Sequence, residues 1–352
     1  MKRLFACLVL MTAALAVRAD YPPVLPGAAL EFPRDFGAHP AYRTEWWYAT
    51  GWLEDEGGVE RGFQVTFFRV RPRVNEDSAS RFAPRQLVLA HAAVADVDEG
   101  RLLHAERSAR ALAPLAGAEE GDTRAWVGDW LLEREDGGYR TSVSAGDFAF
   151  DLDLVPDRVP VLNGRSGYSQ KAPDPLNASY YYSRPQLAVA GELTIRGETQ
   201  RVRGQAWLDH EWSSEILPEG ARGWDWIGIN LADGGSLMAF QMRDAEGDAL
   251  WGAATLAGPD REARTFGSDE IEFVPRRRWR SPRTGAEYVV EWDVRVGQRR
   301  FSLVPLMDDQ ELDARASTGA IYWEGAVRML EDGREAGRGY LEMTGVRERL
   351  RM

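Results

Sequence analysis

The stretch 206–230, AWLDHEWSSEILPEGARGWDWIGIN, decides how the rest of the sequence is interpreted. It holds four of the thirteen tryptophans and a histidine flanked by two acids. If AWLDHEW is a β-strand, its side chains alternate, so His210 and Trp212 share one face. Asp209 and Glu211 share the opposite face with a further tryptophan. Because each face combines titratable groups with aromatic rings, the pattern predicts a strand with polar chemistry on both sides.

A second stretch, residues 45–53 (EWWYATGWL), begins with the same Glu-Trp pair about half a chain earlier. The two stretches predict the opening strands of two similar halves. Around them, short runs rich in Val, Phe, Tyr and Trp recur at spacings typical of β-barrels and sandwiches. Glycine-rich breaks at 54–58, 135–138 and 232–235 are typical of hairpin turns. The sequence therefore predicts an all-β chain whose two β-rich domains meet near residues 213–223.

The first nineteen residues are typical of a secretory signal peptide. Lys2 and Arg3 precede an apolar run, and residues 17–19 (VRA) predict cleavage after Ala19. The only cysteine, Cys7, lies in that run, so the mature chain has no thiol for disulfides or metal ligation. We therefore expect an exported, periplasmic protein that depends on core area for its stability.

The composition excludes two classes of partner. The formal charge of −12 becomes −15 once Lys2, Arg3 and Arg18 are removed. Such acidity disfavours binding to nucleic acids or anionic lipid surfaces. No later run reaches the roughly 18 apolar residues of a membrane helix, so we expect no integral membrane protein. The basic run 276–280 (RRRWR) could hold an anion, but it is more typical of a solvated edge strand.

Residues 156–185 show little regular pattern, and the strand-like runs stop there. A segment of this length is far longer than most loops and is usually functional or disordered. Three consecutive tyrosines, at 180–182, argue against disorder. We therefore predict an ordered loop that packs as a lid over a barrel mouth or an inter-domain groove.

His210 is compatible with three roles. A zinc site needs three or four ligands, and no H-E-x-x-H or paired-histidine spacing occurs, so the sequence predicts no metal. A histidine–aspartate pair could perform acid/base chemistry near neutral pH. Alternatively, His210 is a structural histidine that ties two strands together. G-x-S-x-G, G-x-G-x-x-G and Walker A motifs are absent, so neither a nucleophile elbow nor a nucleotide cofactor is predicted.

The aromatic residues cluster in the two Glu-Trp stretches and suit a flat or apolar ligand in a barrel mouth. Barrel core is the alternative explanation, because aromatic strand residues fill cores in any case. The predicted ligand-binding residues are Trp47, Tyr48, Tyr181, Trp212, Trp224 and Trp226.

Several motifs resemble the carotenoid 1,2-hydratase/AttH-type family of lipocalin-like proteins. They are EWWYATGWL, VLNGRSGYSQK with ASYYYSRPQL, AWLDHEWSS, GWDWIGINL, LMDDQELDARASTG and IYWEGAV, and together they span nearly the whole mature chain. The resemblance implies two tandem lipocalin-like antiparallel β-barrel domains, at 20–215 and 216–352. It also implies chemistry without a metal or nucleotide cofactor.

Two functions follow from the resemblance. The first is binding of an apolar or amphiphilic small molecule, such as a lipid or isoprenoid, with an accessory role beside an ABC-type transport system. The alternative is a hydratase or lyase that protonates an alkene of an isoprenoid or polyene and adds water. The candidate catalytic residues are His210, Asp225, Asp209 and Glu211.

His210 and Trp212 match the His-x-Trp of the hydratases. An aromatic residue and an acid two positions apart are expected on a following strand. The candidate segment LMAFQMRD offers Phe240 and Met242 instead. Asp225 is the nearest substitute, although alternation directs it away from Trp224 and Trp226.

Overall fold

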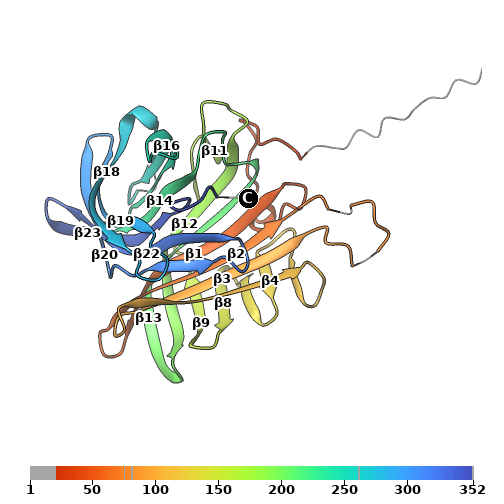
Figure 1. The fold of residues 1–352 in the computed structure, drawn as a ribbon, viewed down its shortest axis with the longest axis horizontal. Helices are drawn as coiled ribbons and strands as arrows, with labels where there is room; N and C mark the ends of the chain where they lie inside the picture. The colour runs from red at the N-terminus through yellow and green to blue at the C-terminus, as the bar shows by residue number, and fades with distance from the viewer. Residues whose placement is uncertain (1–20, 75, 81, 261, 351–352) are drawn as a thin grey trace, which may run out of the picture.

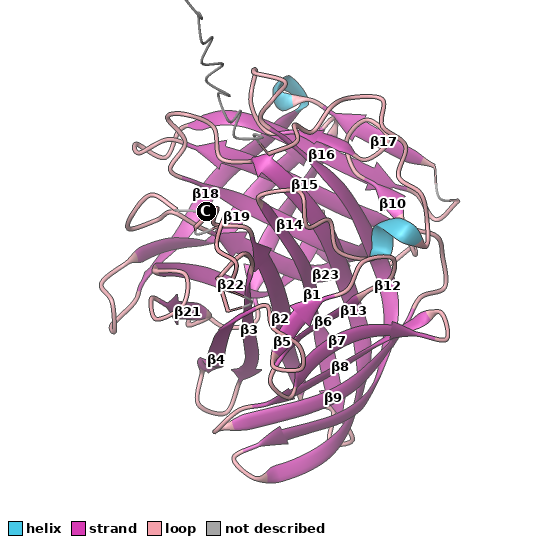
Figure 2. Cartoon of the chain, turned by 90° about the vertical axis from the view of Figure 1, so that its right-hand side faces the viewer, coloured by secondary structure: helices cyan, strands magenta, loops and turns pink. Residues whose placement is uncertain are grey.

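The computed structural model describes residues 21–74, 76–80, 82–260 and 262–350. The described residues form 23 β-strands and two single-turn 3₁₀ helices, η1 (Arg34–Phe36) and η2 (Ser268–Glu270), so the predicted all-β class is confirmed (Figure 2). The predicted signal peptide, residues 1–19, lies outside the described residues. Within the described residues, no helix has the length and apolarity needed to cross a membrane.

Sheet A is an antiparallel sheet of thirteen strands in the order β4-β3-β2-β1-β13-β12-β9-β8-β7-β6-β5, with β10 and β11 added against β12. Strands β3 and β4 at one end contact β5 and β6 at the other, so the sheet rolls into a nearly closed barrel. Its strands are β1 (Thr44–Asp55), β2 (Glu60–Val70), β3 (Leu87–Asp96), β4 (Arg101–Arg110), β5 (Ala116–Ala118), β6 (Arg124–Val127), β7 (Trp130–Glu135), β8 (Gly138–Ser144), β9 (Phe148–Val155), β10 (Val161–Leu162), β11 (Tyr168–Gln170), β12 (Ala178–Ile195) and β13 (Glu198–Glu215).

Sheet B has ten strands in the order β17-β16-β15-β14-β23-β22-β20-β19-β18, with β21 added against β22. The chain passes from one sheet to the other between the end of β13 and the start of β14. The strands of sheet B are β14 (Gly223–Leu231), β15 (Ser236–Arg243), β16 (Ala249–Ala257), β17 (Ala263–Phe266), β18 (Ile271–Arg280), β19 (Glu287–Val296), β20 (Arg299–Pro305), β21 (Glu311–Ala314), β22 (Ala320–Glu331) and β23 (Arg334–Met343).

The three glycine-rich breaks are hairpin turns, as predicted. They connect β1 to β2, β7 to β8 and β14 to β15. The basic run lies in β18, an edge strand of sheet B, where Arg276 and Arg277 pair with acids on and near β19. The edge-strand interpretation of this run is therefore confirmed.

The interpretation of residues 156–185 as a stretch without strands is wrong. Short strands β10 and β11 form here, and the tyrosines at 180–182 belong to the 18-residue strand β12. The segment is ordered, and it contacts sheet B through hydrogen bonds such as Trp251 Nε1 to the Gln170 carbonyl oxygen (2.9 Å). Periodicity failed here because Tyr180, Tyr181 and Tyr182 are all buried, so neither face of the strand is polar.

Strand β1 and residues 206–214 of β13 are buried on both faces. Their inner faces contribute Trp47, Ala49 and Leu208 to the core of the sheet A barrel. Their outer faces pack against β14, β22 and β23 of sheet B (Figure 1), which produces a separate aromatic core between the sheets. Two glycines allow the sheets to approach closely. A Cβ on Gly62 would lie 2.5 Å from the Tyr340 hydroxyl, and one on Gly228 would lie 3.0 Å from the Trp207 ring.

Candidate functional site

The structure separates the predicted site residues by the face of the strand on which they lie. His210, Trp47 and Trp212 point into sheet A. The remaining predicted residues, except one, lie on the outer side of β1, β12 and β13 or on the facing strand β14. That outer group is Asp209, Glu211, Tyr48, Tyr181, Trp224 and Trp226.

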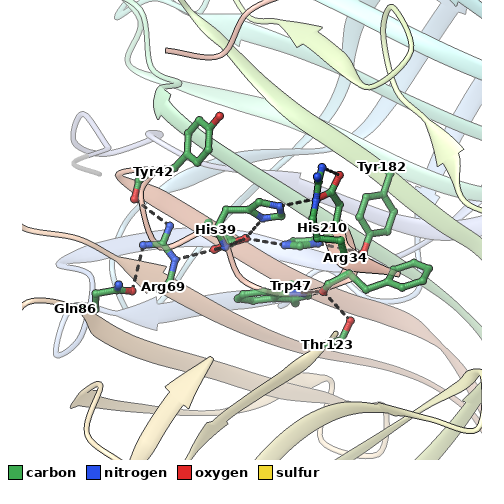
Figure 3. A network of polar contacts seen from close by, with 12 residues as sticks. Arg34, His39, Tyr42, Trp47, Arg69, Gln86, Thr123, Tyr182 and His210 are labelled. Carbon is green, nitrogen blue, oxygen red and sulfur yellow. Dashed lines mark hydrogen bonds and ion pairs between the residues drawn. The ribbon is translucent and has the colours of Figure 1, made fainter. Parts of the chain in front are cut away.

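Glu45 is the centre of the inner group, and Figure 3 shows its partners His39, Arg69 and His210. Its Oε1 accepts hydrogen bonds from His39 Nδ1 (2.7 Å) and His210 Nε2 (2.9 Å), and its Oε2 accepts one from Arg69 Nε (2.7 Å). The His210 ring stacks on Trp47 with centroids 4.6 Å apart. The Tyr182 hydroxyl lies 3.1 Å from His210 Nδ1, so both ring nitrogens of His210 have partners.

These partners determine the protonation states of the inner group. Burial alone would raise the pKa of Glu45, but hydrogen bonds from His210 and His39 and the charge of Arg69 outweigh it and lower the pKa. Burial lowers the pKa of His210 to about 4, against the opposing effect of Glu45. Glu45 is therefore an anion and His210 a neutral imidazole at pH 7.

His39, Glu45 and His210 also place three potential metal-ligand atoms within 4.8 Å of one another. Each of these atoms already takes part in a hydrogen bond within the group. The Arg69 guanidinium occupies the other carboxylate oxygen, and its positive charge opposes a bound cation. The arrangement fits an ion-pair network that ties η1, β1, β2 and β13 together better than it fits a metal centre.

The outer group lines a cleft between the sheets, which we call the intersheet cleft. Its main part has a volume of about 270 Å³ and runs between β1–β3 of sheet A and β14, β22 and β23 of sheet B. A smaller part of about 40 Å³ adjoins it and shares Trp46, Tyr48, Trp224 and Glu342 with it. The walls of the main part are largely apolar; they include Phe68, Val70, Leu87, Leu89, Ala320 and Leu350.

Two carboxyl groups that the sequence analysis did not select lie in this cleft. Glu324 on β22 and Glu342 on β23 are directly opposite each other in the antiparallel register. Burial, together with the neighbouring Glu342, raises the pKa of Glu324 well above its usual value. Burial and nearby carboxylates raise the pKa of Glu342 to about 8. Both side chains are therefore mainly neutral acids at pH 7.

Asp209 is the third acid of the cleft and has a different environment. Its carboxylate accepts hydrogen bonds from the Tyr181 hydroxyl, the Ser183 hydroxyl and Trp207 Nε1, each 2.6 Å long. Burial raises the pKa of Asp209 to about 7 despite these three donors. Asp209 is thus poised to exchange a proton near neutral pH.

Glu211 is the fourth acid, and it alone has a cationic partner. Lys171 Nζ lies 2.9 Å from its carboxylate, donates to Ser169, and sits 4.2 Å from the centre of the Phe240 ring. Lys171 comes from the turn between β11 and β12. The segment predicted to be a lid therefore contributes this charge to the cleft.

Asp225 does not join either group. Its Oδ2 accepts hydrogen bonds from Gln241 Nε2 and Arg243 Nε, both 2.7 Å long, on the far side of β14 from the cleft. This agrees with the alternation that directs Asp225 away from its two tryptophan neighbours.

A polar group closes one end of the main part of the cleft. His91 Nε2 lies 2.8 Å from the Ser317 hydroxyl, and His91 Nδ1 lies 2.6 Å from the Tyr322 hydroxyl. Ser317 also donates to Glu106. The backbone N–H groups of residues 317–319 all bind the Ala314 carbonyl oxygen. Since these amides are occupied, they form no oxyanion hole, and Ser317 lacks the setting of a catalytic nucleophile.

The sequence analysis missed Glu324 and Glu342 although their motifs were visible. Both acids follow aromatic residues in strand-like runs, YWEG and YLEM, as Glu45 precedes aromatics in EWWY. Only the pairing of β22 with β23 brings them together, and no local pattern encodes that pairing.

The comparisons with known proteins agree with the architecture. Residues 23–346 match the model of the AttH-like family. The chain belongs to the AttH-like family. A putative AttH from Nitrosomonas europaea has a similar crystal structure, with 48% sequence identity and a TM-score of 0.86, covering 92% of this chain and 99% of that one. The predicted family resemblance is therefore confirmed.

A more distant relative shares the fold of this AttH-like chain. The crystal structure of kievitone hydratase from Nectria haematococca is 16% identical, with a TM-score of 0.67, and covers 90% of this chain and 93% of that one. The search of curated proteins found no match.

Proposed function

We propose that this AttH-like protein binds an apolar, unsaturated small molecule in the intersheet cleft and catalyses addition or removal of water. The observation that carries the proposal is a pair of facing acids, the buried Glu324 and the half-buried Glu342, in an apolar cleft without a basic partner. A neutral carboxyl group in an apolar site is the acid that protonation of an isolated alkene requires. The name and fold of kievitone hydratase support the same reaction class.

In the forward direction, the protonated carboxyl of Glu342 donates its proton to one carbon of the double bond. The alkene's π electrons form the new C–H bond and leave a cation on the other carbon. The rings of Trp46, Tyr48 and Trp224 line this part of the cleft and stabilise the cation through their faces. A water oxygen then bonds to the cation and must lose a proton.

Asp209 is the base that accepts this proton. Its three hydrogen-bond donors favour the carboxylate form, whereas Glu324 and Glu342 lack comparable support. The neighbouring acids thus have pKa values that burial and hydrogen bonding set apart, which is the usual basis for an acid–base pair. Proton exchange with solvent restores both groups after turnover, and the reverse sequence removes water.

The test is an assay of purified protein with acyclic terpenoid alkenes in ¹⁸O-labelled water. The proposal expects a hydrated product carrying one ¹⁸O atom, formed by the wild type and lost in Glu342→Gln. Glu331→Gln is a matched control on β22, because Glu331 pairs with Arg299 away from the cleft. Binding of the alkenes without any labelled product would instead identify a carrier, as expected for an accessory of an ABC-type transport system.

The proposal includes export to the periplasm. It rests on the charged start, apolar run and small residues of segment 1–19. N-terminal sequencing of protein from the periplasmic fraction should begin at Asp20. Recovery of an uncleaved chain from the cytosol would contradict this part of the proposal.

A further inference from the structure

The intersheet cleft contains buried oxygen atoms with little hydrogen-bond support, since Tyr48 and Glu324 have at most each other as partners. Among the described residues, Oε1 of Glu324 and the hydroxyls of Tyr48 and Tyr340 are buried and make no hydrogen bond of ordinary geometry. An unpaired buried polar group destabilises the folded protein, and a ligand that pairs with it removes that cost. Tyr48 and Glu324 both line the main part of the cleft, so two of these atoms belong to groups that a ligand can reach.

Three acids of the cleft also lack a positively charged partner. None of the ion pairs found among the described residues involves Glu324, Glu342 or Asp209. The one lysine that lines the cleft, Lys171, is engaged by Glu211 and Ser169. Ionisation of either unpaired glutamate would therefore leave a negative charge in an apolar site, which is strongly unfavourable without a counter-charge.

Aromatic rings surround this acidic pair. Trp46, Tyr48 and Trp224 line the cleft beside Glu342, and Trp226 is the direct neighbour of Glu342 on β14. Ring faces attract cations, most strongly when the cation is desolvated, and aromatic cages are the usual receptors for quaternary ammonium groups. The acids and the aromatic rings of this cleft therefore both favour a positively charged ligand.

We infer that the Glu324–Glu342 pair and its aromatic walls form a binding subsite for an apolar organic cation, such as a lipophilic ammonium compound. The apolar wall residues Phe68 and Leu89 would take the hydrocarbon part. A hydrated metal ion is a poor fit, because Mg²⁺ and Ca²⁺ need six or more oxygen ligands and the rings and aliphatic side chains supply none.

The inference rests on the proposed function in placing the ligand in this cleft, and it adds the ligand's charge. A cationic ligand resembles the cation formed when an alkene is protonated. Ligands that resemble a high-energy intermediate bind more tightly than neutral analogues. A lipophilic ammonium compound should therefore also compete with a neutral alkene substrate.

The experiment compares two probes of similar length, decyltrimethylammonium and 1-decanol, by isothermal titration calorimetry on the mature protein. The ammonium compound is kept below its micelle-forming concentration and the alcohol below its solubility limit. We expect the ammonium compound to bind at least tenfold more tightly than the alcohol. In the double variant Glu324→Gln/Glu342→Gln, the two affinities should become equal while that for decanol is kept. Glu331→Gln, the same substitution outside the cleft, should retain the wild-type preference.

The possible outcomes test two claims, the cation subsite and the proposed function of the cleft. Equal affinities in the wild type, with measurable decanol binding, would overturn the cation subsite and leave the proposed cleft function in place. Persistence of the preference in the double variant would also overturn it. If neither probe binds, the cleft is not the ligand site and the proposed function fails as well. Thermal melts of each variant show whether the protein measured is folded.

Discussion

The two faces of β1 and β13 contain buried acids in opposite chemical states. Glu45, on the inner face, is fully buried and has an arginine and two histidines as partners. Glu324, which is equally buried, and Glu342, which is half-buried, face the outer side of β1 and have only weak polar support and no basic partner. Burial alone therefore does not determine the role of an acid. The number and charge of its partners do.

This difference in partners distinguishes Glu45, which has a structural role inside sheet A, from Glu324 and Glu342, to which we assign a function on the other side of β1. Glu45 connects η1, β1, β2 and β13, so its charge stabilises the barrel. The cleft acids connect nothing by ion pairs, and their neutral form is available for chemistry. Five predictions test this difference between the inner group and the cleft acids.

The largest effect is expected for Glu45→Gln. The amide cannot balance the charges of Arg69 and His39, which stay buried or partly buried beside it. Removing one partner of a buried ion pair typically costs about 3–5 kcal/mol, so the free energy of unfolding should fall by that amount in urea titrations. A loss below about 1 kcal/mol, similar to that of the exposed control Glu331→Gln, would refute the structural role of Glu45.

Glu342→Gln should reduce activity without reducing stability, whereas Glu45→Gln should reduce stability. We expect the rate of water addition to fall about 100-fold or more, because general acid catalysis typically contributes a factor of 10²–10⁴. The free energy of unfolding should not decrease, since an amide replaces an already neutral acid. Activity near the wild-type value would exclude Glu342 as the proton donor.

His210→Gln tests whether the inner group has any direct role in the cleft. His210 is enclosed by Glu45, Tyr182 and Trp47 and does not line the cleft. We expect the free energy of unfolding to fall by about 1–3 kcal/mol through lost buried hydrogen bonds, with ligand affinity unchanged in the folded protein. A tenfold loss of affinity with an unchanged melting temperature would instead assign His210 to the functional site.

The pH dependence of stability should also differ between the two regions. The folded-state pKa values of Glu342, about 8, and Asp209, about 7, lie above those of the unfolded chain. The folded state therefore binds more protons, and stability declines as the pH rises from about 5 to about 8. Because one pKa unit corresponds to about 1.4 kcal/mol, we expect a decline of several kcal/mol between pH 5 and 8.5.

The inner group affects stability at lower pH. The folded state lowers the pKa of Glu45, so the stabilising contribution of Glu45 is lost only as the pH falls below its unfolded-state pKa near 4.5. Denaturant titrations across pH 4–9 measure both limbs. The double variant Glu324→Gln/Glu342→Gln should reduce the alkaline limb to the part that Asp209 contributes and keep the acid limb. An unchanged alkaline limb would show that these glutamates are ionised in the wild type.

Much of this organisation could be predicted from the sequence. Alternation in AWLDHEW placed His210 and Asp209 on opposite faces, and glycine-rich turns marked three hairpins correctly. The family motifs predicted the fold. These features are local, so short windows of sequence contain them.

The missing parts depend on contacts between distant segments. Glu324 and Glu342 become a pair only through the register of β22 with β23, and they form a cleft only where sheet B meets the outer face of sheet A. The strand containing Tyr180–Tyr182 was missed because both of its faces are buried, which removes the polar–apolar alternation that reveals a strand.

The proposed function requires that the cleft acids are protonated, and infrared difference spectroscopy measures their protonation state directly. Spectra of the wild type minus Glu324→Gln/Glu342→Gln at pH 6.5 should show the C=O band of a protonated carboxyl group, which is resolved from the carboxylate bands. The wild type minus Glu331→Gln spectrum should show loss of carboxylate bands only. Carboxylate bands alone in the first difference spectrum would mean that both cleft glutamates are ionised, and they would contradict the account.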